Sequence, residues 1–144
     1  MEQTLTENIL LGPRNEVWLA DFGIATTMGS LPRTSYGRQA IRGTVRYMAP
    51  EQIQGTPLSA SDQYALAVMV YEWLCGAPPF SSTEIAVCLQ HVSAPPPRLR
   101  ERVPSMPPTV ERIILKAIEK DPRQRFAHVL EFVSALKKAS LGQR

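Results

Sequence analysis

The chain has few of the features that define several common classes of protein. It contains two cysteines, Cys75 and Cys88, which form no CxxC pair and have no histidine nearby at a metal-binding spacing. Reduced thiols packed as small apolar residues are therefore favoured over a disulfide framework or a zinc site. The longest apolar run, residues 65–71, is far too short to span a bilayer, and residues 1–8 lack a signal-peptide pattern. We expect a cytoplasmic protein with no membrane segment.

An excess of one charge is also lacking. The 144 residues carry 16 Lys and Arg against 13 Asp and Glu, a net charge of +3. The basic residues are scattered, and aromatic residues make up only 7% of the chain. A nucleic-acid surface would show a basic stripe interleaved with aromatics, so nucleic acid is not expected as a partner. A hydrophobic content of 44% fits a soluble globular domain with a sizeable core.

Two short apolar runs near the start predict a small β-hairpin. They are residues 9–11 and 17–20, and residues 12–15, Gly-Pro-Arg-Asn, supply the turn between them. Residues 21–57 show no clean periodicity and are rich in Gly, Ser, Thr and Arg, which predicts a long loop. Loops of this length are uncommon in compact domains and are often functional.

About four helices are expected in the rest of the chain. The first begins at Ser59, with Asp62 completing a capping box, is apolar on nearly every side, and ends at Gly76. The second begins at Ser81, the third near Thr109, and the last precedes a polar tail at 137–144. Each of these last three helices has one expected apolar face. The faces are Ile85, Cys88, Leu89 and Val92 in the second helix, Val110, Ile113, Ile114, Ala117 and Ile118 in the third, and Val129, Phe132, Val133 and Leu136 in the last.

The ends of the predicted hairpin carry two oxygen ligands. Asn8 and Asp21 flank the two strands, so the turn brings an amide and a carboxylate to the same open end. Hard oxygen ligands of this kind suit Mg²⁺, which often bridges to substrate phosphates. Gly23 allows a sharp turn just after the carboxylate. A strand that simply ends in an Asp-x-Gly turn is the alternative, and residues 21–23 alone do not separate the two.

Further motifs along the chain decide between these interpretations. The motifs are DFG at 21–23, GTVRYMAPE at 43–51, SD at 61–62, GAPPF at 76–80 and DPRQRF at 121–126. In this order and spacing, the chain resembles the C-terminal lobe of a eukaryotic-like serine/threonine protein kinase of the bacterial type. The resemblance implies a partial kinase domain over residues 1–136 with a mainly α, α+β family fold, a small hairpin and a long activation segment.

The resemblance also implies roles for single residues around the phosphates. Asn8 and Asp21 match the two family residues that hold Mg²⁺ against ATP, so both cofactors are expected. Phe22 matches the aromatic residue whose packing separates active from inactive states, and Thr44 lies near the substrate hydroxyl. The Gly-Thr pattern at 43–44 fits kinases that act on protein serine and threonine.

Three more residues match structural positions of the family. Glu51 matches the acidic end of the activation segment, and Arg125 matches its distant partner. A buried pair between them would hold the segment to the late helices. Asp62 matches the aspartate that supports the catalytic loop, although plain helix capping is an alternative. His91 and His128 have no matching partners and are expected to be surface or packing residues.

Several kinase residues have no match in these 144 residues. The N-terminal lobe is absent, with its glycine-rich loop, ATP-binding lysine and paired glutamate, and Gln3, a neutral side chain, falls at the position of the catalytic base. The sequence therefore offers no convincing catalytic base, and the chain alone is expected to be inactive. It could then bind a protein substrate, or a separate N-terminal kinase portion. A non-catalytic, pseudokinase-like binding module and a helical regulatory domain unrelated to kinases are the alternatives.

Overall fold

The computed structural model of the chain describes residues 9–11, 17–19 and 45–142. The chain divides into two compact units, Met1–Gln39 and Ala40–Arg144. Each unit is described by itself below.

The first unit contains the predicted hairpin. Strands β1 (Ile9–Leu11) and β2 (Val17–Leu19) pair antiparallel, with Ile9 opposite Leu19 and Leu11 opposite Val17. Both runs contain the aliphatic and aromatic residues that favour strands, and the Gly-Pro sequence between them favours a turn. The predicted hairpin is therefore confirmed.

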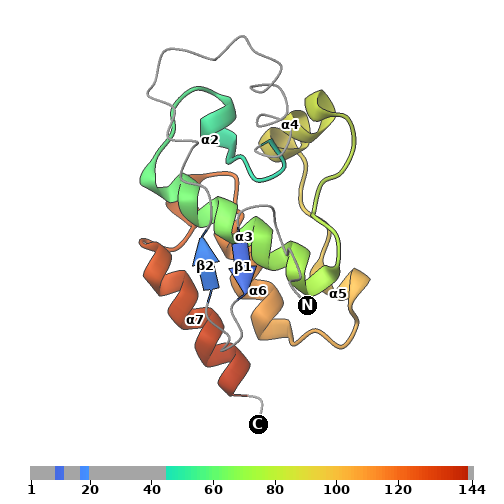
Figure 1. The fold of residues 1–144 in the computed structure, drawn as a ribbon, viewed down its shortest axis with the longest axis vertical. Helices are drawn as coiled ribbons and strands as arrows, with labels where there is room; N and C mark the ends of the chain where they lie inside the picture. The colour runs from blue at the N-terminus through green and yellow to red at the C-terminus, as the bar shows by residue number, and fades with distance from the viewer. Residues whose placement is uncertain (1–8, 12–16, 20–44, 143–144) are drawn as a thin grey trace. The chain divides into compact units, whose positions relative to one another are not determined.

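The second unit is helical. Figure 1 shows α3 crossing the unit, with α2 and α4 together above it and α5, α6 and α7 below it. α3 contacts α5, α6 and α7, and α2 contacts α4. The elements are α2 (Pro50–Ile53), α3 (Ser59–Cys75), α4 (Glu84–Ser93), α5 (Leu99–Arg102), α6 (Pro108–Ala117), the 3-10 turn η1 (Pro122–Gln124) and α7 (Val129–Leu141). Among the described residues, none of these helices combines the length and hydrophobicity that crossing a bilayer requires.

The central helix α3 begins and ends at the predicted places, but its start is built differently. Leu58 is the N-cap, and its backbone N–H donates to the Ser61 hydroxyl at 3.0 Å. The predicted capping box of Ser59 with Asp62 is therefore wrong, because Ser59 is already the first helical residue. At the other end, Gly76 adopts a φ of 76°, a left-handed conformation in which glycine avoids the penalty of a Cβ atom.

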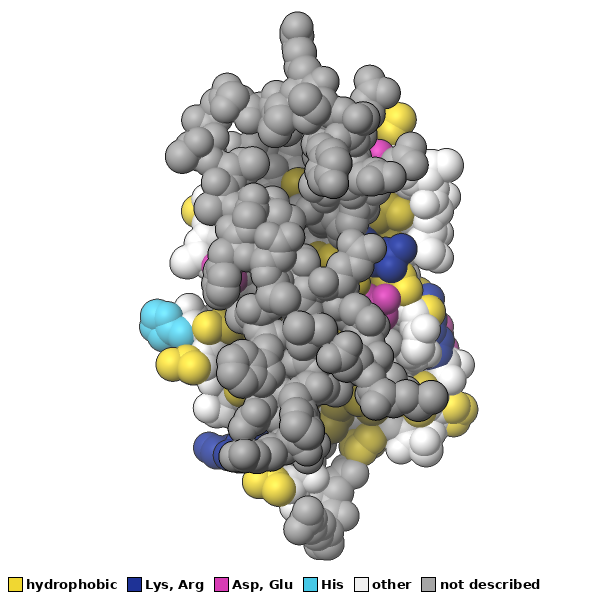
Figure 2. All heavy atoms as spheres, in the orientation of Figure 1, with side chains coloured by type: hydrophobic (Ala, Val, Ile, Leu, Met, Phe, Trp, Pro, Cys, Tyr) yellow, Lys and Arg dark blue, Asp and Glu magenta, His cyan; other side chains and the backbone are white. Residues whose placement is uncertain are grey.

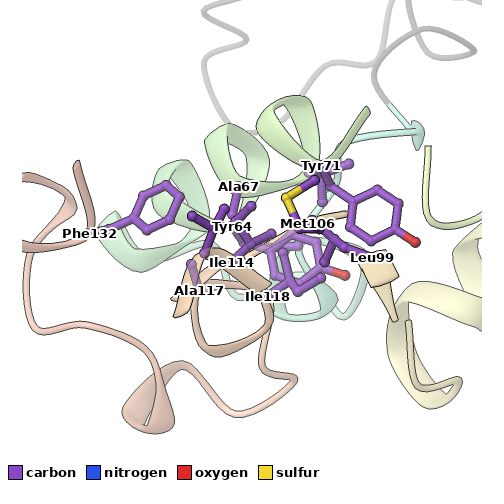
Figure 3. Packing of buried hydrophobic residues seen from close by; sticks show 12 residues of the cluster. Tyr64, Ala67, Tyr71, Leu99, Met106, Ile114, Ala117, Ile118 and Phe132 are labelled. Carbon is purple, nitrogen blue, oxygen red and sulfur yellow. The ribbon is translucent and has the colours of Figure 1, made fainter. Parts of the chain in front are cut away.

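A single large core lies between α3 and the helices that follow it. Figure 3 shows Tyr64, Ala67 and Tyr71 of α3 gathered with buried side chains of α6, α7 and the segment around α5. Van der Waals contact and loss of apolar surface to water stabilise this packing. The remaining fully or nearly fully buried members are Ala49, Val68, Leu99, Met106, Val110, Ile114, Ala117, Ile118 and Phe132.

The expected apolar face was correct for α6 and only partly correct for α4, where Cys88 packs against Val45, Phe80 and Val87 but two other residues of the face do not. Four of the five α6 face residues are buried, and Ile113 packs against the core. In α4, by contrast, Ile85 and Leu89 are 76% and 63% exposed, whereas Val87 and His91 are buried. The buried face of α4 is rotated away from its most hydrophobic residues, because α2 and the loop before α4 determine which side is covered.

Helix α7 differs from expectation in two respects. Phe132 is fully buried, but Val129 and Val133 remain partly exposed. The helix also continues through Leu141, into the segment expected to be a polar tail. Helix-favouring Ala, Leu and Lys residues at 135–139 allow this continuation.

Candidate functional site

Three of the predicted site residues lie in the described part of the chain. These are Glu51, Asp62 and Arg125, all in the second unit. No group of three His, Cys, Asp or Glu residues within the described ranges could hold a metal ion. The other predicted site residues lie outside the described residues: Gln3, Asn8, Asp21, Phe22, Gly23 and Thr44.

Glu51 is buried at the start of α2. Pro50 occupies the first helical position, where its missing N–H costs no hydrogen bond, and Glu51 follows in the first turn. The Ser61 hydroxyl donates to Glu51 Oε1 at 2.8 Å. Burial alone would raise the pKa of Glu51, but hydrogen bonds from Arg125, the backbone and Ser61 outweigh it and hold the pKa below its ordinary value. Glu51 is therefore an ionised, fixed carboxylate.

Arg125 is the partner of that carboxylate. Its Nη1 and Nη2 donate to the two oxygens of Glu51 at 2.7 and 2.9 Å, which is a bidentate pair. The remaining N–H groups donate to the carbonyls of Ala60 at 3.0 Å, Glu119 at 2.8 Å and Lys120 at 3.3 Å. All five donors of the guanidinium are thus used, which offsets the cost of burying the charge.

The geometry of the pair joins three parts of the chain. Glu51 belongs to α2, Arg125 follows η1, and Ser61 belongs to the first turn of α3. The paired residues are 74 positions apart in sequence. Because one ion pair joins α2 and the turn before α7 at the start of α3, it ties the Val45–Glu51 stretch to the late helices.

Asp62 occupies an exposed position in the first turn of α3. A carboxylate there interacts favourably with the partial positive charge of the helix N-terminus. Its predicted support of the catalytic loop stays a prediction, because that loop lies outside the described residues.

His91 is linked to the Glu51–Arg125 pair through Tyr64. The Arg125 guanidinium stacks over the Tyr64 ring at 4.9 Å, and the Tyr64 hydroxyl lies 2.8 Å from His91 Nδ1. His91 Nε2 in turn lies 2.9 Å from the carbonyl oxygen of Arg46. His91 was expected to be a surface or packing residue; it is a fully buried packing residue. Burial lowers the pKa of His91 to about 4, so the ring is neutral at pH 7.

The residues after Thr44 form a second polar cluster. The Tyr47 hydroxyl donates to Glu72 Oε2 at 2.6 Å, and Arg46 Nη1 lies 3.7 Å from Glu72 Oε1. Burial, followed by the hydrogen bond and charge of Glu72, raises the pKa of Tyr47 to about 12. Tyr47 therefore stays protonated and links its loop to α3.

An open cleft of about 580 Å³ lies between this loop and the start of α4. Arg46 contributes a side chain that is 53% exposed, while Phe80 and Val87 form an apolar floor. The other lining residues add hydroxyl groups and the carboxylate of Glu84, so the cleft is open and mixed in polarity. The lining residues are Val45, Arg46, Phe80, Ser81, Ser82, Thr83, Glu84, Ile85 and Val87.

A few Lys and Arg side chains are visible on the described surface that Figure 2 presents. They lie among hydrophobic and other side chains. Exposed apolar residues include Trp73 and Leu74 on α3 and Leu130 on α7.

Sequence reasoning missed the His91 bonds and the Tyr47–Glu72 bond. Their partners are 27, 45 and 25 positions apart in sequence. The spacing of residues within one helix cannot indicate hydrogen bonds to other parts of the chain. Tyr47 stood inside the GTVRYMAPE motif, which was the one available indication that it matters.

The family model of the protein kinase domain matches residues 6–138. The chain belongs to the protein kinase family. The unrelated helical domain is thereby ruled out, and nothing in the comparisons favours the pseudokinase-like alternative.

Bacterial serine/threonine kinases are among the relatives. The serine/threonine-protein kinase PknF of Mycobacterium tuberculosis is 39% identical over 135 residues, covering 90% of this chain and 28% of PknF. PknA of the same organism is 37% identical over 139 residues, covering 95% and 31%. PrkC of Bacillus subtilis is 36% identical over 134 residues, covering 92% and 20%. The chain thus spans less than a third of the length of these relatives.

A solved structure gives the same result for the fold. The kinase domain of Mycobacterium tuberculosis PknI matches with a TM-score of 0.63 and 27% identity, covering 92% of this chain and 43% of that domain. The mainly helical architecture is therefore that of a kinase C-terminal lobe.

Proposed function

We propose that this chain supplies the C-terminal part of a kinase that transfers phosphate from ATP to serine or threonine of a protein substrate. The observation that carries the proposal is the buried Glu51–Arg125 pair, within a chain that matches the kinase family over residues 6–138. The pair anchors the end of the segment that contains Thr44, where the family resemblance locates the substrate hydroxyl. The cleft beside Val45 and Arg46 is the proposed binding surface for the protein substrate.

Asn8 and Asp21 are the proposed magnesium ligands. A carboxylate and an amide oxygen form a hard donor set that fits Mg²⁺. Bound MgATP would supply the phosphoryl group and neutralise charge on its phosphates. The chain's own contribution is to hold the metal through these two side chains and to orient the acceptor protein.

Residues 1–144 are proposed to be inactive by themselves. Gln3, at the position of the base, is neutral and cannot accept the proton of the substrate hydroxyl. These residues also contain no glycine-rich phosphate loop. A complementary N-terminal kinase portion is therefore a proposed partner, and the exposed Trp73 and Leu74 offer it apolar surface.

A chimera tests the proposal directly. Residues 6–138 would replace the matching segment of PknF, which then supplies the base and the nucleotide-binding lobe. We expect the chimera to transfer labelled phosphate from MgATP to a protein substrate and Asp21→Ala to abolish transfer. Arg123→Ala is the matched control, since this side chain is 89% exposed. A chimera that melts cooperatively yet transfers no phosphate would overturn the proposal.

The isolated polypeptide provides the second arm. Purified 1–144 should incorporate no labelled phosphate into the same substrate. Robust incorporation that Asp21→Ala abolishes would show that the chain is active without a second portion.

A further inference from the structure

His91 lies where two hydrophobic clusters meet. The smaller cluster contains Val45, Phe80 and Val87, and the large core contains Tyr64. The His91 ring packs edge-on against Phe80, with centroids 5.0 Å apart, and against Tyr64 at 5.6 Å. The histidine is fully buried, although it is the most polar side chain on the buried face of α4.

The two hydrogen bonds of the ring define its tautomer. A carbonyl oxygen can only accept, so Nε2 must bear the proton that is donated to Arg46 at 2.9 Å. Nδ1 is then the acceptor, and the Tyr64 hydroxyl donates to it at 2.8 Å. A neutral ring with the proton on Nε2 satisfies both partners, whereas the other neutral tautomer would leave the Arg46 carbonyl facing a lone pair.

The Arg46 carbonyl belongs to the loop that lines the cleft. Arg46 and Val45 line the cleft, and the backbone here turns tightly, with the Met48 N–H donating to the Val45 carbonyl at 3.2 Å. That turn is local, so it does not attach the loop to the helices. The bond from His91 attaches the loop to α4, in addition to the Tyr47–Glu72 bond that attaches it to α3. The His91 ring also packs against Phe80, which lines the same cleft.

We infer that His91 is a positioning residue that fixes the Arg46 backbone, and with it one wall of the cleft, through the tautomer protonated on Nε2. Tyr64 orients the ring from the opposite side, and Arg125 stacks on Tyr64, so the ion pair and the cleft wall share one support. The consequence for protein-substrate binding rests on the proposed function, whereas the anchoring of the loop does not.

The tautomer can be measured on the unaltered chain. In ¹⁵N-labelled protein at pH 7, we expect long-range histidine spectra to show a protonated Nε2 and an unprotonated Nδ1 for His91. Tyr64→Phe should shift the Nδ1 resonance, because it removes the hydroxyl donor. Protonation of Nδ1 at pH 7 would overturn the inference without any variant having to fold.

Proteolysis tests the anchoring of the loop. Trypsin cleaves after Arg46 only when the backbone there opens, and Arg112, exposed on α6, serves as the internal reference. His91→Phe keeps a ring of similar size but loses both hydrogen bonds. We expect it to speed cleavage after Arg46 by about tenfold relative to Arg112. His91→Gln, whose amide can still donate to the Arg46 carbonyl, should restore most of the protection.

An unchanged ratio of the two cleavage rates in His91→Phe would contradict the inference. In the PknF chimera, His91→Phe should raise KM for the protein substrate more than it lowers kcat. Inactivity of the unmodified chimera would refute the proposed function, while the spectra and the cleavage ratio would still test His91.

Discussion

Arg125 and Glu51 are charged residues that the fold removes from water. Burying either charge alone would cost a large desolvation free energy. The bidentate contact and the additional hydrogen bonds offset that cost for the pair. The distant motifs at 43–51 and 121–126 suggested such a pair through family resemblance. The distances, the full use of the guanidinium donors and the part of Ser61 emerge only from the packed structure.

Removal of one partner should therefore be severe. Arg125→Met should lower the free energy of unfolding by about 3–5 kcal/mol, because Glu51 would remain buried without its cation. Urea denaturation of 1–144 measures the change. The double variant Glu51→Met, Arg125→Met should lose less than Arg125→Met alone, since no charge is then stranded. A loss in Arg125→Met no larger than that of the exposed control Arg123→Ala would contradict this account.

At the scale of elements, periodicity predicted where helices occur better than which faces they bury. The α6 pattern identified its core face because hydrophobic residues there recur on one side and α3 and α7 cover that side. In α4 the most hydrophobic residues, Ile85 and Leu89, lie on the open side. A single helix cannot encode the direction from which its neighbours approach.

Helix ends follow local chemistry and are correspondingly predictable. Gly76 ends α3 with a φ of 76°, and a Cβ built there would meet no atom within 4 Å. The cost of Gly76→Ala is therefore conformational, and we expect a loss of about 1 kcal/mol in the free energy of unfolding. Gly142 has a φ of −70°, so Gly142→Ala carries no left-handed penalty; its Cβ would lie 3.3 Å from the Lys138 carbonyl oxygen, and the variant should still cost less than Gly76→Ala. Equal effects on the urea midpoint would argue against the left-handed cap as the cause.

For the molecule as a whole, His91 links acidity to stability. Its pKa in the folded chain is about 4, against an ordinary value of 6.5. The unfolded chain therefore takes up the proton first as the pH falls, which favours unfolding. The stabilisation is fully present above about pH 6.5 and is lost progressively towards pH 4. Besides burial, the positive charge of Lys120 adds to the cost of protonating His91, whereas the hydrogen bond to the Arg46 carbonyl partly offsets the lowering of its pKa.

The expected change in the free energy of unfolding between pH 7 and pH 4 is large enough to measure. Each pKa unit corresponds to about 1.4 kcal/mol, so His91 should account for about 3 kcal/mol of lost stability between pH 7 and pH 4. Urea denaturation across this range should show a smaller loss in His91→Gln than in the unaltered chain. Comparison with this variant removes the contribution of carboxylates such as Glu51, which also titrate at the acid end. Parallel pH curves for the two proteins would contradict the assignment.

The sequence by itself determined the hairpin, the order and approximate bounds of α3, α4, α6 and α7, and the kinase motifs that identify the family. Those features depend on neighbouring residues, whose propensities and spacing are visible in one dimension. The sequence missed the short helices α2, which lies inside the expected loop 21–57, and α5. Only the tertiary structure decided that Ile85 and Leu89 are exposed, that Leu58 rather than Ser59 is the N-cap of α3, and that His91 donates to the Arg46 carbonyl. Burial and hydrogen bonding at these positions depend on elements far away in sequence, and the directions from which those elements pack are properties of the folded chain alone.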